Sequence, residues 1–289
     1  MSVVTATSPP DLTPFEGVID RLDMAVSAPV VVQRLLATLA DPRSTVRDVE
    51  AVLAVDAALV MRLLKLASSA AYARRPVRDL GGAIRTVGLE QLMRLAVTAH
   101  FAQGKSPLSR ELWSYALAVA FTCEKLAIAS HLPPGPDPFL SGLLHDIGTL
   151  VLDRLFGERY ARLGIVPGDE RQVALEQQEF GFDHTDLGAM AVARWKLFPE
   201  LELVVQLHHQ PLVADLLGLP ASARAVIELV ALARLSLVVA RDGLGHEAPE
   251  ALSLRTELAS RVGLTEVDAW ACADEGRAKA VEVLGALGG

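Results

Sequence analysis

The chain has 289 residues, enough for one large domain or two smaller ones with a sizeable core. Aromatic residues make up only 5% of it, and Gly and Pro are dispersed, which is typical of a globular helical protein. The formal charge of -8 argues against nucleic acid or an anionic lipid surface as the main partner, because both reward a basic face.

The cysteines and the N-terminal segment indicate a compartment. Cys123 and Cys272 are far apart within helical patterns, so we expect free thiols in a reducing environment. Residues 1–14 are expected to be a flexible tail. They lack the basic and apolar regions of a secretory signal. No run reaches the roughly 18 to 20 uncharged apolar residues that cross a bilayer. These features predict a soluble, cytoplasmic protein without a membrane partner.

The first third of the chain has helical periodicity. Apolar residues recur at three and four positions over 32–39 and again over 59–72, and no useful length alternates with period two. Thr45 and Asp48 resemble a capping box that begins a helix. Gly81-Gly82 is expected to interrupt the pattern before a helix over 89–101.

The remaining pattern is also helical. Helices are expected over 107–131, 139–156, 170–180, 183–195, 199–209, 222–241, 249–262 and 265–284. The segment 139–156 is apolar nearly all round, which marks it as central. The chain is therefore predicted to be all-α, with a helical subdomain over 15–105, a helical core over 106–242 and a helical extension over 243–289. This extension could pack back on the core, cover a site or form a homodimer contact.

His145 and Asp146 stand together inside the apolar segment 139–156. Burying such a pair costs free energy unless partners replace the lost water. A divalent metal binds imidazole nitrogen and carboxylate oxygen together, and helical bundles build metal sites from several helices. His184, His208 and His209 follow on later predicted helices, so we predict these five residues as metal ligands. The alternative for each histidine is a packed core residue with one hydrogen bond.

The segment from Phe139 to Gly148 resembles the signature of the HD superfamily, specifically of its HDOD branch, a bacterial domain associated with signalling. The similarity runs over residues ~25 to 215. It includes Ala28-Pro29, Val55-Asp56-Ala57-Ala58-Leu59, Leu66-Ala67-Ser68-Ser69-Ala70-Ala71-Tyr72, Ala83-Ile84, Val87-Gly88, Phe180-Gly181-Phe182-Asp183-His184, Leu187-Gly188, Trp195 and His208-His209-Gln210-Pro211. The resemblance implies a multi-helical HD-like bundle.

The chain departs from the catalytic members of that superfamily. Hydrolases of this kind supply an additional histidine from the preceding helix, and Tyr115 stands at the matching position. Thr149 replaces a lysine of the related cyclic-dinucleotide phosphodiesterases, and their Gly-Tyr-Pro element is absent after Gln210. Ser68-Ser69 and Asp56-Ala57 differ from the usual Asn-Ser and Asp-Pro. The resemblance therefore implies a degenerate metal site in a regulatory protein, since losing a ligand removes the geometry that activates water.

Two functions remain in competition at this point. The favoured one is a non-catalytic signal-transduction module that binds a signalling protein or a nucleotide second messenger. The alternative is a metal-dependent phosphohydrolase that uses Fe, Mn, Zn or Ni at the five predicted ligands. A basic cluster in the N-terminal part could dock a nucleotide or an acidic partner, although pairing with Asp79 and Glu90 explains it more simply. The cluster comprises Arg74, Arg75, Arg78, Arg85 and Arg94.

Overall fold

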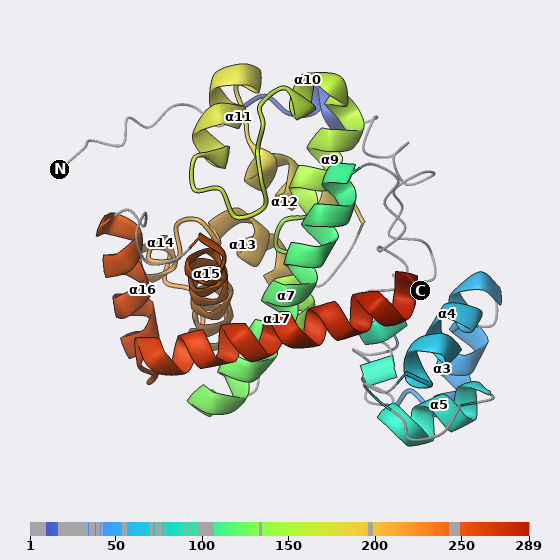
Figure 1. The fold of residues 1–289 in the computed structure, drawn as a ribbon. Coiled ribbons are helices and arrows are strands. Elements are labelled where there is room, and N and C mark those ends of the chain that lie inside the picture. Colours follow the sequence, from blue (N-terminus) through green and yellow to red (C-terminus); the bar gives the residue numbers. More distant parts are fainter. Residues whose placement is uncertain are drawn as a thin grey trace.

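A computed structural model describes residues 10–16, 34, 38, 41, 43–53, 57–69, 72, 77, 79–88, 91–92, 94–96, 107–132, 135–195, 199–242 and 249–288. Within these residues every regular element is a helix, which confirms the all-α prediction (Figure 1). The N-terminal group contains α3 (Val46–Leu53), α4 (Ala57–Ala67) and α5 (Leu80–Val87). The central part contains α7 (Pro107–Ser130), α8 (Pro138–Leu144), α9 (Ile147–Phe156), α10 (Glu158–Ala161), α11 (Gln172–Phe180), α12 (His184–Arg194), α13 (Pro199–Leu207), α14 (Val213–Leu216) and α15 (Ala221–Asp242). Helices α16 (Pro249–Arg261) and α17 (Glu266–Gly288) end the chain.

Two expectations about the N-terminal group have different outcomes. The Asp48 carboxylate accepts hydrogen bonds from the Thr45 backbone N–H (2.8 Å) and hydroxyl (2.6 Å), so this pair does mark the start of α3. The predicted break at Gly81-Gly82 is wrong, because both glycines lie in the first turn of α5. Asp79 caps that helix by accepting from the Gly82 N–H at 2.6 Å, and this cap compensates the low helix propensity of glycine.

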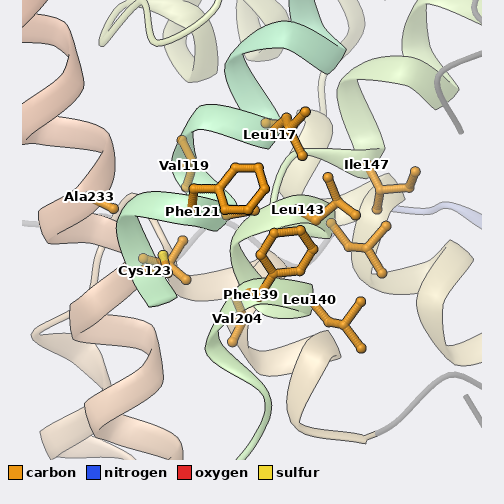
Figure 2. Packing of buried hydrophobic residues seen from close by; sticks show 14 of the residues in the cluster. Leu117, Val119, Phe121, Cys123, Phe139, Leu140, Leu143, Ile147, Val204 and Ala233 are labelled. Atoms are coloured by element: carbon orange, nitrogen blue, oxygen red, sulfur yellow. The ribbon is translucent and has the colours of Figure 1, made fainter. Parts of the chain in front are cut away.

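Helix α7 lies along the centre of the bundle. Residues 110–130 are long and apolar enough to cross a membrane by length and composition alone, but 61% of the apolar window is buried inside the protein. Phe121 on this helix packs edge-to-face against Phe139 of α8, with ring centroids 5.1 Å apart (Figure 2). A buried core helix can have the same length and composition, and the burial of α7 fits such a helix.

The predicted helix over 139–156 is divided in two. Helix α8 ends at Leu144, α9 begins at Ile147, and His145 and Asp146 form the turn between them. The backbone of Asp146 leaves the helical region (φ -109°, ψ 24°), which interrupts the ladder of helical hydrogen bonds. The doublet therefore lies at the junction of two buried helices.

The C-terminal segment packs back on the core. Helix α17 crosses the bundle and contacts α7, α15 and α4, so it joins the central part to the N-terminal group (Figure 1). A Cβ atom on Gly276 of α17 would lie 2.6 Å from the Thr122 backbone nitrogen of α7, which shows how closely these helices approach. The expectation that this segment packs back on the core is therefore confirmed.

Two glycines allow α9 and α12 to cross in near contact. A Cβ atom on Gly148 would overlap the carbonyl oxygen of His184, and a Cβ atom on Gly188 would lie 3.1 Å from the backbone nitrogen of Gly148. Backbone atoms of the two helices therefore occupy the space that larger residues would need. The crossing therefore depends on the absence of a side chain at both positions.

Replacing Gly148 with Ala tests this crossing. The added methyl group would push α12 away from α9, so we expect a loss of roughly 2 to 4 kcal/mol in the free energy of unfolding. Urea denaturation followed by circular dichroism measures the change. Gly285→Ala in α17 is the matched control, because nothing lies within 4 Å of its added Cβ atom. Equal stability of the Gly148→Ala variant and the wild type would contradict the contact.

Candidate metal centre

His145 is completely buried at the end of α8. Its Nδ1 atom lies 2.7 Å from the Gly142 carbonyl oxygen, and because a carbonyl only accepts, Nδ1 must carry the proton. Its Nε2 atom is therefore unprotonated in the neutral ring, and it has no hydrogen-bond partner among the described residues. A buried lone pair of this kind requires a proton or a cation.

His184 begins α12 and is also completely buried. Asp183 caps the helix and forms a capping box with Asp186, which fixes the first turn. The Glu176 carboxylate of α11 accepts from the His184 backbone N–H (2.8 Å) and from its ring Nδ1 (2.6 Å). The hydrogen bond from Nδ1 to this carboxylate turns Nε2 toward the other histidines, which is the usual arrangement for a metal-binding histidine.

His208 and His209 follow α13 in a turn. Nδ1 of His208 donates to the Val205 carbonyl oxygen at 2.8 Å, so its Nε2 also points forward. The Nε2 atom of His184 lies 3.4 Å from that of His208, 3.1 Å from that of His209 and 3.5 Å from Asp146 Oδ1. The four histidines and one carboxylate predicted as ligands thus converge, since the His145 ring also lies 5.0 Å from the His208 ring.

The spacing of these atoms fits a shared cation. Ligand atoms about 2.1 Å from one zinc or similar ion lie about 3.0 to 3.5 Å from one another, and the separations around His184 Nε2 fall in that range. Nitrogen and oxygen donors of this kind suit Fe, Mn, Zn or Ni. The residues present therefore fit a divalent metal geometrically.

Four residues of the site were missed in the sequence: Glu176, Gln172, Tyr160 and Arg234. The Glu176 carboxylate also accepts from the Tyr160 hydroxyl (2.5 Å) and from Gln172 Nε2 (2.9 Å). Gln172 donates in turn to the Thr149 hydroxyl (2.7 Å), which donates to Asp146 Oδ1 (2.6 Å). Nothing in the local pattern separates Glu176 from solvated glutamates, because only the tertiary contacts bury it.

Arg234 enters the site from α15. Its side chain is buried, and Nη1 donates to the His208 carbonyl oxygen at 3.2 Å. Nη2 lies 3.3 Å from Nδ1 and 3.5 Å from Nε2 of His209, and 3.5 Å from the half-exposed carboxylate of Glu170. The site thus contains a permanent positive charge supplied by the protein itself.

The charges around the histidines move their pKa values in opposite directions. Burial, with the charge of Arg234, lowers the pKa of His145 to about 4. Burial and the neighbouring His209 and Arg234 hold the pKa of His208 well below its usual value. Burial acts against the charged form of His184 as well, but the Asp146 and Glu176 carboxylates outweigh it and raise that pKa. The cluster therefore holds most of its imidazoles neutral, as metal binding requires.

The departures from the catalytic pattern face the same site. The Tyr115 ring lies 6.1 Å from the His145 ring, so the tyrosine does stand beside the cluster. Thr149 is buried and bonded to Asp146 rather than directed outward. A small hollow beside Asp146 is lined mainly by apolar residues, namely Leu112, Trp113, Ala116, Leu143, Ile147 and Leu150. Apart from Asp146, this hollow is therefore apolar.

The predicted basic cluster is only partly described. Arg94 pairs with Glu124 (2.6 Å) and Asp137 (3.0 Å), and exposed Arg85 lies 3.9 Å from Asp79. Arg74, Arg75 and Arg78 lie outside the described residues. Where the structure describes these arginines, they therefore pair with acidic side chains of the chain itself.

Replacing Glu176 with Gln tests the support of His184. The amide keeps the shape but loses the charge that four donors share, so we expect a loss of about 2 to 4 kcal/mol in the free energy of unfolding. Glu179→Gln on the same helix is the control, because Glu179 is exposed and its pairing with Arg159 is worth at most about 1 kcal/mol. Equal losses in the two variants of α11, measured in urea, would refute the special role of Glu176.

The lowered pKa of His145 predicts acid sensitivity. Unfolding restores its pKa to about 6.5, so the unfolded chain binds more protons and stability falls as pH drops below that value. His145 alone should cost about 2 kcal/mol between pH 7 and pH 5, with His208 and His209 adding to the loss and His184 opposing it. Melting temperatures in chelator should show a shallower acid slope for His145→Gln than for the wild type. Exposed His131→Gln should leave the slope unchanged; identical slopes in all three proteins would exclude the explanation.

Comparison with known proteins identifies the family and supports the fold. A model of the HDOD domain family matches residues 26–211. Two crystal structures superpose with a TM-score of 0.68 at 22% identity. One is an HDOD domain protein with unknown function from Geobacter sulfurreducens, matched over 96% of this chain and 98% of that chain. The other is a candidate phosphohydrolase from Shewanella amazonensis SB2B, matched over 93% and 97%. At this identity the likeness shows the fold alone.

Two further comparisons concern longer proteins. A candidate signal transduction protein from Marinobacter aquaeolei VT8 has a TM-score of 0.68 at 18% identity, over 96% of this chain and 66% of that one. An uncharacterized protein from Treponema pallidum (strain Nichols) is 25% identical over 229 residues, which are 76% of this chain. The chain spans less than half (44%) of that relative. With the family match covering most of its length, the chain belongs to the HDOD domain family.

Proposed function

We propose that this HDOD protein is a non-catalytic signal-transduction module. It binds a signalling protein or a nucleotide second messenger and transmits the bound state by repacking its helices. Its site of action is the cytoplasm, where free thiols such as Cys123 and Cys272 persist. Because a longer relative exists, further segments could add activities to the whole protein.

The observation that carries this proposal is the closure of the histidine cluster. Relative exposures are 0% for His145 and His184, 1% for His208 and 9% for Asp146, whereas His209 is partly exposed at the edge of the cluster. A metal-dependent hydrolase must bring a phosphate oxygen and a water molecule to its metal. The apolar hollow beside Asp146 offers no polar groups for a phosphate except the Asp146 carboxylate, which would repel it.

The side chains around the cluster support the same proposal. Tyr115 stands where catalytic relatives are expected to have a histidine, and a protonated phenol is a poor ligand for a divalent metal. The Thr149 hydroxyl donates its hydrogen bond to Asp146, and threonine provides no positive charge for a phosphate. The cluster is therefore better suited to holding helices together than to activating water.

A metal would be held by Asp146 and the imidazoles of His145, His184, His208 and His209. When bound, Fe, Mn, Zn or Ni would lower the pKa of a coordinated water. Glu176 would orient the His184 ring through its Nδ1 atom in either function. The spacing of the donor atoms favours the second candidate function, a metal-dependent phosphohydrolase acting on nucleotides or cyclic dinucleotides.

A route for the signal is provided by α17. This helix contacts α4 at one end and α7 and α15 elsewhere, so a displacement of either group changes its packing (Figure 1). Cores have discrete packing arrangements, which makes such helices suitable for switching. The module could also form a homodimer through an exposed face.

Hydrolysis assays separate the two functions. Wild-type protein supplied with Fe²⁺ or Mn²⁺ should cleave cyclic dinucleotides and nucleoside phosphates no faster than Asp146→Ala protein, because the site is closed and incomplete. Calorimetric titration with the same nucleotides then tests binding without turnover. Rates at the level of ordinary enzymes, lost on Asp146→Ala, would overturn the proposal and favour the phosphohydrolase.

A further inference from the structure

Arg234 carries a charge that the surrounding protein balances only weakly. Its side chain is 5% exposed, and its nearest acidic partner, Glu170, is 44% exposed and 3.5 Å away. Partly buried Arg94, in contrast, has two carboxylates within 3.0 Å. A guanidinium is always protonated in proteins. The charge of Arg234 therefore acts mainly on the histidine cluster that it touches.

The contact with His209 decides what that imidazole can bind. A neutral imidazole has one unprotonated nitrogen, and a guanidinium can only donate. Because Nη2 of Arg234 lies 3.3 and 3.5 Å from the two ring nitrogens, the lone pair of His209 accepts from Arg234. The same lone pair cannot bind a metal. The Nδ1 atoms of His145, His184 and His208, in contrast, face oxygen acceptors, which puts the lone pair of each ring on Nε2. Nε2 of His209 lies 3.1 Å from the lone pair of His184, so it donates there when Nδ1 of His209 accepts from Arg234.

The buried charges point in the same direction. Asp146, Glu176 and Asp183 are buried carboxylates at the cluster, and Arg234 already supplies one positive charge beside them. A divalent ion would therefore share this buried region with a guanidinium, where the repulsion between two positive charges is poorly screened. Without the guanidinium, the carboxylates would attract the ion unopposed.

We infer that Arg234 is a resident cation that withdraws His209 from the ligand set and disfavours divalent metal binding in this chain. The cluster is then held together by the protein's own positive charge, and removal of that charge turns it into a competent metal site. Arg234 acts as a positioning residue, through His209 and the His208 backbone. The role concerns metal content, so it holds whichever partner the module binds.

Metal titration of three proteins tests this role of Arg234. Zn²⁺ is measured by calorimetry, and the visible spectrum of added Co²⁺ reports nitrogen and oxygen ligation. We expect Arg234→Met to bind one ion at least tenfold more tightly than the wild type, since like charges separated by a few ångströms interact strongly when buried. Arg234→Lys keeps the charge and should bind as weakly as the wild type. Arg255→Gln, which removes another buried arginine on α16, controls for general destabilisation and should not gain affinity.

A second variant identifies the ligand that Arg234 withholds. His209→Gln should leave the weak Zn²⁺ affinity of the wild type unchanged, but it should weaken binding in the Arg234→Met background. Stoichiometric metal in purified wild-type protein, or tight Zn²⁺ binding by it, would overturn the inference even if Arg234→Met failed to fold. Equal affinity of Arg234→Met and the wild type would do the same. Tight metal binding by the wild type without hydrolysis would overturn this inference and leave the proposed function standing, whereas metal-dependent hydrolysis by the wild type would overturn both.

Discussion

The close crossing of α9 and α12 is the constraint on which the site depends. Gly148 and Gly188 lack side chains where the two backbones meet, and a Cβ atom on Gly148 would overlap the His184 carbonyl oxygen. Because His184 is the first residue of α12, this contact places its ring beside Asp146 in the turn before α9. The two residues are 38 positions apart in sequence, and only the missing side chains allow their elements to approach so closely.

Around that crossing, a closed set of hydrogen bonds joins the two buried carboxylates. Thr149 bonds to Asp146, Gln172 bonds to Thr149 and Glu176, and Glu176 holds His184, whose other nitrogen lies 3.5 Å from Asp146. Buried polar groups stabilise a fold only when nearly all of them are satisfied. Such a network rigidifies the junction, and the same residues that would support a metal therefore also explain how charged groups are tolerated in an apolar core.

The cluster combines features of a metal centre with features that oppose one. Forward-facing imidazoles and suitable donor spacing belong to the first kind, whereas Tyr115, the burial of the cluster and the charge of Arg234 belong to the second. The inferred difference is electrostatic, because one guanidinium offsets one of the three buried negative charges that would attract a divalent ion. Under the proposed function, the fold keeps its histidines for internal packing rather than for the activation of water.

The sequence by itself determined the helical class, most helix positions, the HDOD family and the five residues that converge, because apolar periodicity and the His-Asp doublet are local signals. It did not separate α8 from α9, since apolar residues dominate both and the interruption at Asp146 is a backbone feature. It misjudged Gly81-Gly82, which a cap from Asp79 keeps helical. Tertiary structure alone decided the burial of Glu176, the approach of Arg234 from α15 and the packing of α17, because contacts between residues far apart in sequence leave no local pattern.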